Sequence, residues 1–272
     1  MTGLNVLAGK AFTASDDGGF HAPNINEEFF PPAIFFEGTP FEITRVILVR
    51  LIAVAILMLV FWLALRKPKT VPGKLQSLVE LGVGFVRDGI VFEMLGERIG
   101  RKYLPYIVTV FFGVLFMNLT TVTPFLNISA NGLFGMPLVL GLTTYVIFIV
   151  AGIREVGGWK FFKNALFPSG VPWPLYILLT PIELVNTFLI RPLSLALRLM
   201  LNLMVGHLLL VLCYSATWFF FGLMSAMSAM GVLTLAGAFL MTLIELLVSV
   251  LQAYVFALLT TSYIQLSVAD EH

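Results

Sequence analysis

Charged residues are scarce in this chain: 11% of its 272 residues are charged, whereas 59% are hydrophobic. A soluble domain usually carries about 25% charged residues. The composition therefore excludes an ordinary soluble domain and indicates a protein that crosses a membrane several times. The net charge of +1 gives no indication of an acidic partner or of nucleic acid.

Cysteine and histidine are also rare. The single cysteine, Cys213, allows no disulfide within the chain and no cysteine cluster, and its apolar surroundings indicate a small buried hydrophobic residue. His207 is the only histidine between positions 164 and 269. A haem held by two histidines needs a pair of them inside the membrane, so a membrane electron carrier of that kind is excluded. We expect neither a metal nor a cofactor in this chain.

The first part of the chain lacks a long apolar stretch. Residues 1–42 are polar and acidic and contain glycine and proline. A cleaved signal peptide needs a continuous apolar core, and none is present there. We therefore expect an irregular external segment over 1–42.

Long apolar runs begin after this segment. About 20 helical residues cross a hydrocarbon core of about 30 Å, so the runs predict crossing helices at 43–65, 103–122 and 136–153. Between the first two, 71–102 has apolar residues at helical spacing among many charges. This pattern predicts an amphipathic helix, or a pair, that lies at the membrane interface or packs on a partner. An ordinary surface helix remains an alternative for this stretch. Together, residues 43–163 are predicted to form a three-span part that contains the cytoplasmic amphipathic stretch 71–102 and ends in a short basic loop with Arg154, Lys160 and Lys163.

The last part of the chain, 164–272, is predicted to form a helical hairpin. Stretches 175–214 and 231–268 are too long for upright spans, because the first alone would reach about 60 Å as a helix. We predict two long, tilted, antiparallel helices joined through 215–230, with bends permitted at Pro181 and Pro192. The fold class is thus an all-α membrane protein with five crossings and an interfacial amphipathic helix.

Basic residues predict the orientation. They gather in 66–102 and 154–163, whereas the loops 123–135 and 215–230 carry none. The positive-inside rule places the first set in the cytoplasm. With five crossings, the N-terminus is then outside and the C-terminus is cytoplasmic.

The polar residues of the predicted hairpin pair off by depth. If the turn lies near 223–225, residues at equal depth have numbers that sum to about 450. Arg198 is then level with Gln252, His207 is near Glu245, and Glu183 is near Tyr263. At about 100° per residue, one face of each helix collects the polar side chains: Glu245, Ser249, Gln252 and Tyr263 on one helix, and Arg191, Ser194, Arg198 and Asn202 on the other.

This pairing predicts two polar zones with Arg198 between them. The outer zone holds His207 and Glu245, and the cytoplasmic zone holds Glu183, Ser194 and Tyr263. A charge inside the membrane costs about 2.5–3.5 kcal/mol and usually marks an ion path or faces a partner charge, so Arg198 is the predicted functional centre.

Simpler interpretations remain open for several of these residues. Arg191 lies where its side chain can reach the membrane surface, and Glu183 can be an exposed interfacial residue. Asn202 and Gln252 can join helices by hydrogen bonds.

Two segments carry a family resemblance. RPLSLALRLMLNLMVGHLLL and IELLVSVLQAYVFALLTTSYI, in this order and spacing, resemble subunit a of the bacterial rotary F-type ATP synthase. NLTTVTPF, at 118–125, is similar to the family's second-span ending. The resemblance covers most of the chain after residue 40.

The resemblance implies a role for each matching position. Arg198 matches the arginine that faces the proton-carrying carboxylate of the c-ring, with Gln252 and Asn202 beside it. His207 and Glu245 match a polar pair that lines the outer half-channel. The implied protein is a proton channel of the bacterial inner membrane that contacts the c-ring, subunit b of the peripheral stalk, the rest of the synthase and lipid.

ATP chemistry is expected on other subunits, since this chain has no glycine loop that would cradle phosphate. The chain by itself is therefore not expected to be an enzyme. A stand-alone secondary transporter is the alternative; it usually has internal repeats, and none relates the first three predicted spans to the last two.

Overall fold

A computed structural model describes residues 29, 33–35, 42–66, 72–123, 128, 130–166, 176–223 and 228–268. Within these ranges, five helices are long and apolar enough to cross a membrane, which confirms the predicted all-α membrane class. Most of the predicted external segment, and the C-terminal residues 269–272, lie outside the described ranges. The only strands in the described part are two short ones, β1 (Ala33–Phe35) and β2 (Ile43–Thr44), which pair antiparallel.

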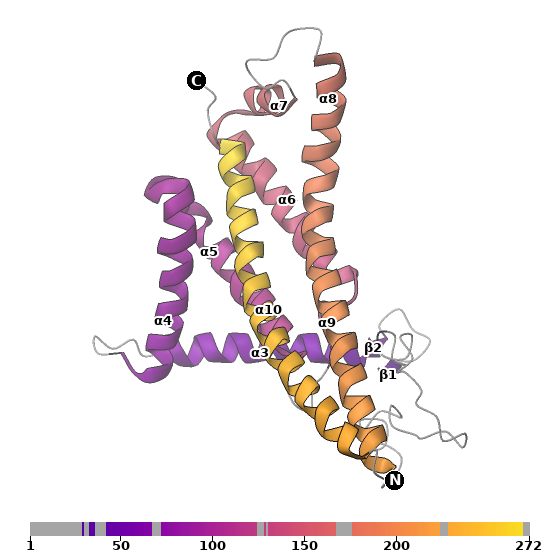
Figure 1. Cartoon of the computed structure of the whole chain (residues 1–272). Helices are drawn as coiled ribbons and strands as arrows, with labels where there is room; N and C mark the ends of the chain where they lie inside the picture. The colour runs from indigo at the N-terminus through magenta and orange to yellow at the C-terminus, as the bar shows by residue number, and fades with distance from the viewer. Residues whose placement is uncertain are drawn as a thin grey trace.

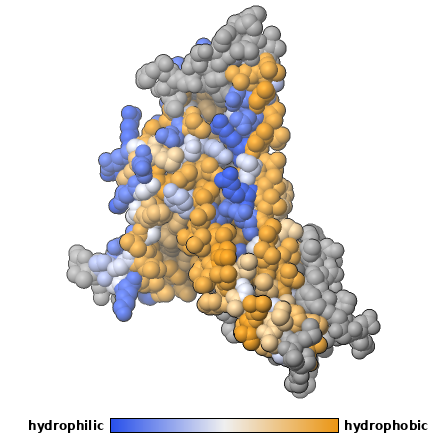
Figure 2. All heavy atoms as spheres, in the orientation of Figure 1, coloured by the Kyte–Doolittle hydropathy of each residue, from blue (hydrophilic) through white to orange (hydrophobic). Residues whose placement is uncertain are grey.

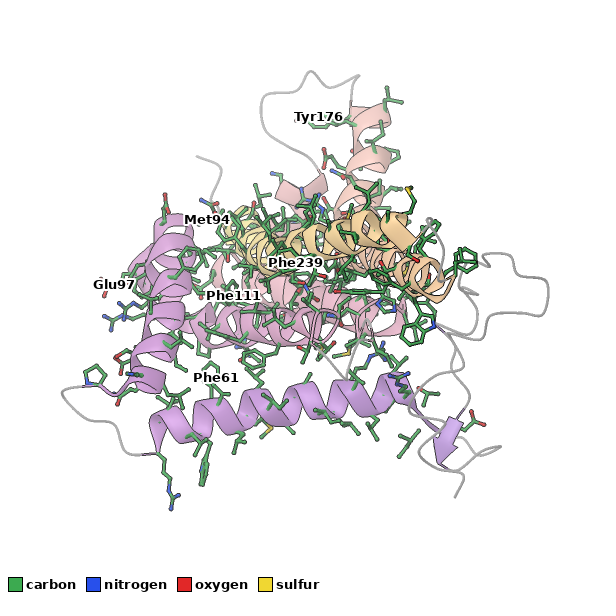
Figure 3. The ribbon with its side chains drawn as sticks, turned by 60° about the horizontal axis from the view of Figure 1, so that its bottom comes forward. Phe61, Met94, Glu97, Phe111, Tyr176 and Phe239 are labelled. Atoms are coloured by element: carbon green, nitrogen blue, oxygen red, sulfur yellow. The ribbon has the colours of Figure 1, made fainter. Side chains whose placement is uncertain are left out.

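The first crossing helix, α3, spans Arg45–Leu65 and is apolar on all sides apart from Arg45 and Arg50 in its first two turns. It begins where the hydroxyl of Thr44 accepts a hydrogen bond from the backbone N–H of Ile47. Figure 1 shows α3 running crosswise to α4, which follows it in the chain. Phe61, labelled in Figure 3, connects α3 to the other helices through an edge-on contact with Phe112, with ring centroids 5.0 Å apart.

The predicted amphipathic stretch 71–102 is a helical pair rather than one helix. α4 spans Lys74–Val86, continues through a π-helical segment, η1 (Arg87–Phe92), and enters α5 (Glu93–Leu119). Inside α5, Gly96 has φ 70° and interrupts the helix; this left-handed conformation suits glycine because it has no Cβ. The helix resumes directly after Gly96, so the helix that holds the predicted second span, 103–122, begins before residue 103 and ends at Leu119.

The third crossing helix, α6, spans Gly135–Glu155 and is followed by α7 (Gly158–Leu166). The sequence predicted a basic loop there, and that prediction is wrong. Gly157 has φ 95° and lets the chain turn back. The ring of Phe161 then fills the space beside Gly152, where a Cβ would meet it at 2.3 Å, so burial of this ring stabilises α7 against α6.

Two long helices complete the chain. One runs continuously through α8 (Tyr176–Val185), η3 (Asn186–Ile190) and α9 (Arg191–Gly222), and the other is α10 (Ser228–Val268). They run side by side and antiparallel (Figure 1). At about 1.5 Å per residue, α10 is about 60 Å long. The predicted connection over 215–230 is too long. Its first half is rich in aromatic residues and holds no proline, and it continues α9 to Gly222.

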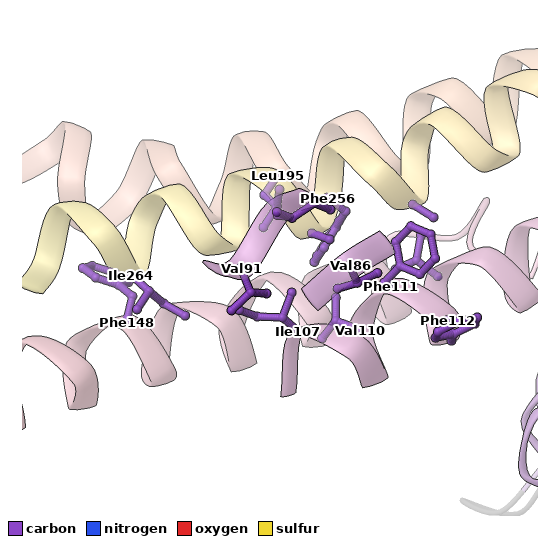
Figure 4. Packing of buried hydrophobic residues seen from close by; sticks show 14 of the residues in the cluster. Val86, Val91, Ile107, Val110, Phe111, Phe112, Phe148, Leu195, Phe256 and Ile264 are labelled. Carbon is purple, nitrogen blue, oxygen red and sulfur yellow. The ribbon is translucent and has the colours of Figure 1, made fainter. Parts of the chain in front are cut away.

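The main core lies between the two long helices and α5 and α6. Figure 4 shows Leu195 of α9 and Phe256 of α10 on the side of Val91 and Ile107, and Ile264 of α10 beside Phe148 of α6; all are almost fully buried. The helices approach closely where α6 has a small residue. A Cβ on Gly141 would lie 2.9 Å from the carbonyl oxygen of Pro192.

Gly141→Ala is expected to push α6 away from α9. The added methyl group has no free space, and overpacking of this kind costs about 1–3 kcal/mol. The measurement is the temperature at which the detergent-solubilised complex loses this subunit, which should fall. Gly113→Ala is the matched control, since a Cβ on Gly113 meets nothing within 4 Å; equal melting of the two variants would contradict the close approach.

Candidate functional site

Polar contacts fix the register of α9 against α10. Thr217 bonds to Thr234 at 3.0 Å, the Tyr214 and Thr242 hydroxyls lie 3.0 Å apart, and the Asn202 amide donates to Gln252 at 2.9 Å. These partners have numbers that add up to between 451 and 456. The antiparallel pairing expected from the sequence is therefore present, shifted by a few residues.

This shift changes the partner of Gln252. The sequence placed Arg198 level with it, but the structure places Asn202 there, one helical turn further along α9. Gln252 is buried at 1% exposure, and its Nε2 has no hydrogen-bond partner in the described part of the chain. The amide oxygen of Gln252 is thus hydrogen-bonded, whereas its amide nitrogen can still donate to a further polar partner.

Arg198 lies on an outward face of α9. Its neighbours Leu195 and Leu199 are buried in the core at 1% and 0% exposure, whereas Arg198 is exposed. Ser194 and Asn202, four residues to either side, are exposed as well, so they share its face. Within the described ranges Arg198 makes no ion pair.

Hydrophilic side chains also gather on one face of the molecule. Figure 2 shows them in the region between the apolar columns of α8–α9 and α10. The rest of this face is mostly hydrophobic, apart from charged groups over α4. A polar strip therefore follows the contact between the two long helices through otherwise apolar surface.

Glu245 is buried against the backbone of α9. Its side chain is 4% exposed, and a Cβ on Gly206 would lie 1.8 Å from its Oε2 atom. The carboxyl group therefore occupies space that exists only because residue 206 is glycine. Its Oε1 atom has no hydrogen-bond partner among the described residues.

His207 follows Gly206 directly in the chain. The sequence predicted that Glu245 pairs with His207, and the structure places the Glu245 carboxyl group against the neighbouring Gly206. The imidazole is buried at 1% exposure. Nine residues from Arg198 at about 100° per residue, it points away from the exposed face that carries the arginine. The ring of Phe29 packs edge-on against it, with centroids 5.8 Å apart.

Two buried asparagines adjoin this zone, and the sequence analysis gave them no role. Asn131 donates to the Asn118 side chain at 2.9 Å, and Asn118 donates to the backbone carbonyl of Ser249 at 3.4 Å. Both asparagines are fully buried. In the sequence, each is only an amide side chain beside an apolar run, and this pattern is too common to predict a role.

The predicted cytoplasmic zone is assembled only in part. The guanidinium of Arg191 lies 5.7 Å from the ring centroid of Tyr263, in a cation–π contact. The exposed Ser194 hydroxyl donates to the Arg191 carbonyl at 3.0 Å. Glu183 is partly exposed on α8, and about 16 Å of helix separates it from Ser194.

The described residues hold no group of three histidine, cysteine, aspartate or glutamate side chains that would bind a metal ion. What the site offers instead is one outward cation and several buried polar atoms inside apolar helices. Charged and polar groups inside membrane helices are typical of proteins that move ions across a bilayer. The fold and the site therefore indicate a protein of this class.

Residues 47–265 match the family described as ATP synthase A chain. The chain belongs to this family, which confirms the resemblance found in the sequence.

Similar curated proteins carry the name ATP synthase subunit a. The protein from Rhodococcus erythropolis is 45% identical over 255 residues, covering 93% of this chain and 92% of the relative. The protein from Streptomyces lividans is 35% identical, covering 94% and 91%. The protein from Pseudarthrobacter chlorophenolicus is 38% identical, covering 96% and 98%. The alternative of a stand-alone transporter is not favoured.

Gly206→Ala is expected to displace the Glu245 carboxyl group, because the new methyl group and Oε2 would occupy the same space. The overpacking costs about 1–3 kcal/mol in the native arrangement of the site. If the carboxyl group must return to that arrangement to transfer a proton, ATP-driven proton pumping in inverted vesicles should fall by about tenfold. Adding Glu245→Asp withdraws the carboxyl group by one methylene and should restore part of the activity. Wild-type pumping by Gly206→Ala alone would contradict the contact.

Proposed function

We propose that two separate polar routes in this chain lead protons to and from a carboxylate of the neighbouring c-ring, with Arg198 between the two routes. As a member of its family, the chain is a non-catalytic, proton-translocating component of the F-type ATP synthase. It is a multi-pass protein of the bacterial plasma membrane. The proposal concerns which residues carry the function and which chains they face.

The exposed Arg198 is the observation that carries the proposal. Its guanidinium stays charged at every working pH. A lasting charge inside an apolar span requires a partner or water, and the described part of the chain supplies no carboxylate to it. The partner is therefore a carboxylate of another chain, in the c-ring.

The outer route comprises His207, Glu245, Ser249 and Gln252. Buried polar atoms almost always have hydrogen-bond partners, yet three here have none within the described residues: Glu245 Oε1, Ser249 Oγ and Gln252 Nε2. Such atoms are normally satisfied by buried water. In this proposal, water beside α10 carries protons toward the ring carboxylate that Arg198 faces. Asn118 of α5 and Asn131, in the connection to α6, extend the polar lining.

The cytoplasmic route comprises Glu183, Arg191, Ser194 and Tyr263. Ser194 lies one turn from Arg198 and shares its exposed face. Arg191 and Tyr263 join α9 to α10 on this side of the arginine. The route is thus offset from the outer one along the helix pair, with Arg198 between the two.

The proton cycle follows from charge. A proton from the outer route neutralises a ring carboxylate, and the neutral group can turn into lipid, whereas a charged one cannot without a large cost. After nearly a full turn the group releases its proton to the cytoplasmic route and meets Arg198. The arginine pairs with the ionised group and blocks a direct leak. Each proton gains about 2.3 kcal/mol per 100 mV of membrane potential.

The remaining chain provides attachment. We propose that the amphipathic face of α4 lies at the cytoplasmic interface and that subunit b of the peripheral stalk packs on the first three spans. The basic residues near 66–102 and 154–163 support a cytoplasmic location for these ends. The N-terminus is then outside, and the C-terminus is cytoplasmic.

Arg198→Ala is expected to abolish ATP-driven proton pumping while the complex still assembles, because no cation would remain to separate the two routes. Pumping is measured by dye quenching in inverted vesicles, and assembly by native gel electrophoresis. Arg154→Ala, at the end of α6, is the control for loss of an arginine as such. Wild-type pumping by Arg198→Ala would end the proposal.

Glu245→Gln is expected to slow proton flux by about a hundredfold, the lower limit of the range by which a positioned acid–base group assists proton transfer. The amide keeps the size of the side chain but cannot exchange a proton at neutral pH. Passive proton conduction through the membrane sector measures the effect. Unchanged conduction would reduce Glu245 to a packing residue.

A further inference from the structure

Phe29 contacts a residue of the outer polar route. It lies before the first crossing helix, far along the chain from α9. Its ring is 4% exposed and packs against the imidazole of His207, with ring centroids 5.8 Å apart and planes at 81°. A residue of the N-terminal segment therefore reaches the outer polar route.

The contact restricts the imidazole in two ways. An edge-to-face arrangement of two rings favours one relative orientation, so Phe29 limits the rotation of the His207 ring. A phenyl ring also offers no hydrogen bond, so the side of the imidazole that it covers is closed to water. His207 is 1% exposed, which agrees with such a cover.

The backbone near Phe29 is anchored to the first span. β1, at Ala33–Phe35, pairs with β2, at Ile43–Thr44, and β2 leads directly into α3. Thr44 in turn caps α3 through the Ile47 N–H. The strand pairing thus ties residues 33–35, which follow Phe29 closely in the chain, to the start of α3.

Glu245 provides the other approach to the histidine. Its carboxyl group lies on Gly206, the residue directly before His207, and its Oε1 atom has no partner in the described part of the chain. A proton can therefore be relayed to the imidazole from the carboxyl side, whereas the phenyl side is apolar.

We propose that Phe29 is a positioning residue, which orients His207 and shields it from direct contact with external water. Protons then reach the histidine through the polar side next to Glu245. The shielding is a property of the fold; its importance for transport rests on the proposed role of His207 in the outer route.

The experiment compares Phe29→Ala, Phe29→Leu and wild type in the intact complex in membrane vesicles. Reaction of His207 with diethyl pyrocarbonate is followed by mass spectrometry of its peptide. Phe29→Ala should accelerate the reaction by about twofold to tenfold, the range that loss of one aromatic pair corresponds to. Phe29→Leu keeps most of the apolar cover and should give a smaller increase, which retains a test if the alanine variant does not assemble.

Phe61→Ala is the matched control, since Phe61 also makes an edge-on ring contact, but with Phe112 of α5. It should leave the labelling of His207 unchanged. Equal labelling of His207 in wild type and in assembled Phe29 variants would overturn the proposal.

The pH profile of ATP-driven pumping separates this proposal from the proposed function. If Phe29 orients a histidine that carries protons, Phe29→Ala should shift the profile and Phe61→Ala should not. Faster labelling with an unchanged profile supports the shielding and removes His207 from the proton route.

Discussion

One electrostatic constraint shapes the long helix pair: Arg198, whose guanidinium keeps its charge at every working pH, lies on the exposed face of an otherwise apolar helix. Such a charge is costly inside a membrane without water or a partner charge, and we propose that a carboxylate of another chain is that partner. The core accommodates this by turning Leu195 and Leu199 inward and Arg198 outward on the same helix. In our proposal, the polar residues of α9 and α10 then form one route on each side of this charge.

Close helix contacts let a membrane protein bury polar groups without unfolding. Gly206 gives the Glu245 carboxyl group a place against backbone, and Gly141 lets α6 approach α9. Around these contacts the aromatic and aliphatic core holds the helices rigidly. The polar atoms left without partners in the described residues are therefore fixed in space, which is what a water-mediated proton route requires.

Much of the fold followed from hydropathy, because a bilayer imposes a minimum helix length and satisfies no backbone polar group. The five crossings and the antiparallel register of α9 against α10 were predicted in this way. The extent of the helices was not: α9 continues past Tyr214, and α7 replaces a basic loop. The ends of these helices depend on residues that interrupt a helix, such as Gly157, and on the packing of Phe161 against Gly152. A hydropathy profile contains no information on either feature.

The sequence by itself determined the membrane class, the family and the two polar faces, since each depends on residue type and spacing along one helix. Tertiary structure decided which groups touch. It gave Gln252 to Asn202, placed Glu245 on Gly206, and brought Asn118 to Ser249 and Phe29 to His207. These contacts join segments that are far apart in the chain. A shift of one helical turn leaves the periodicity of the sequence almost unchanged, yet it is enough to exchange one contact partner for another.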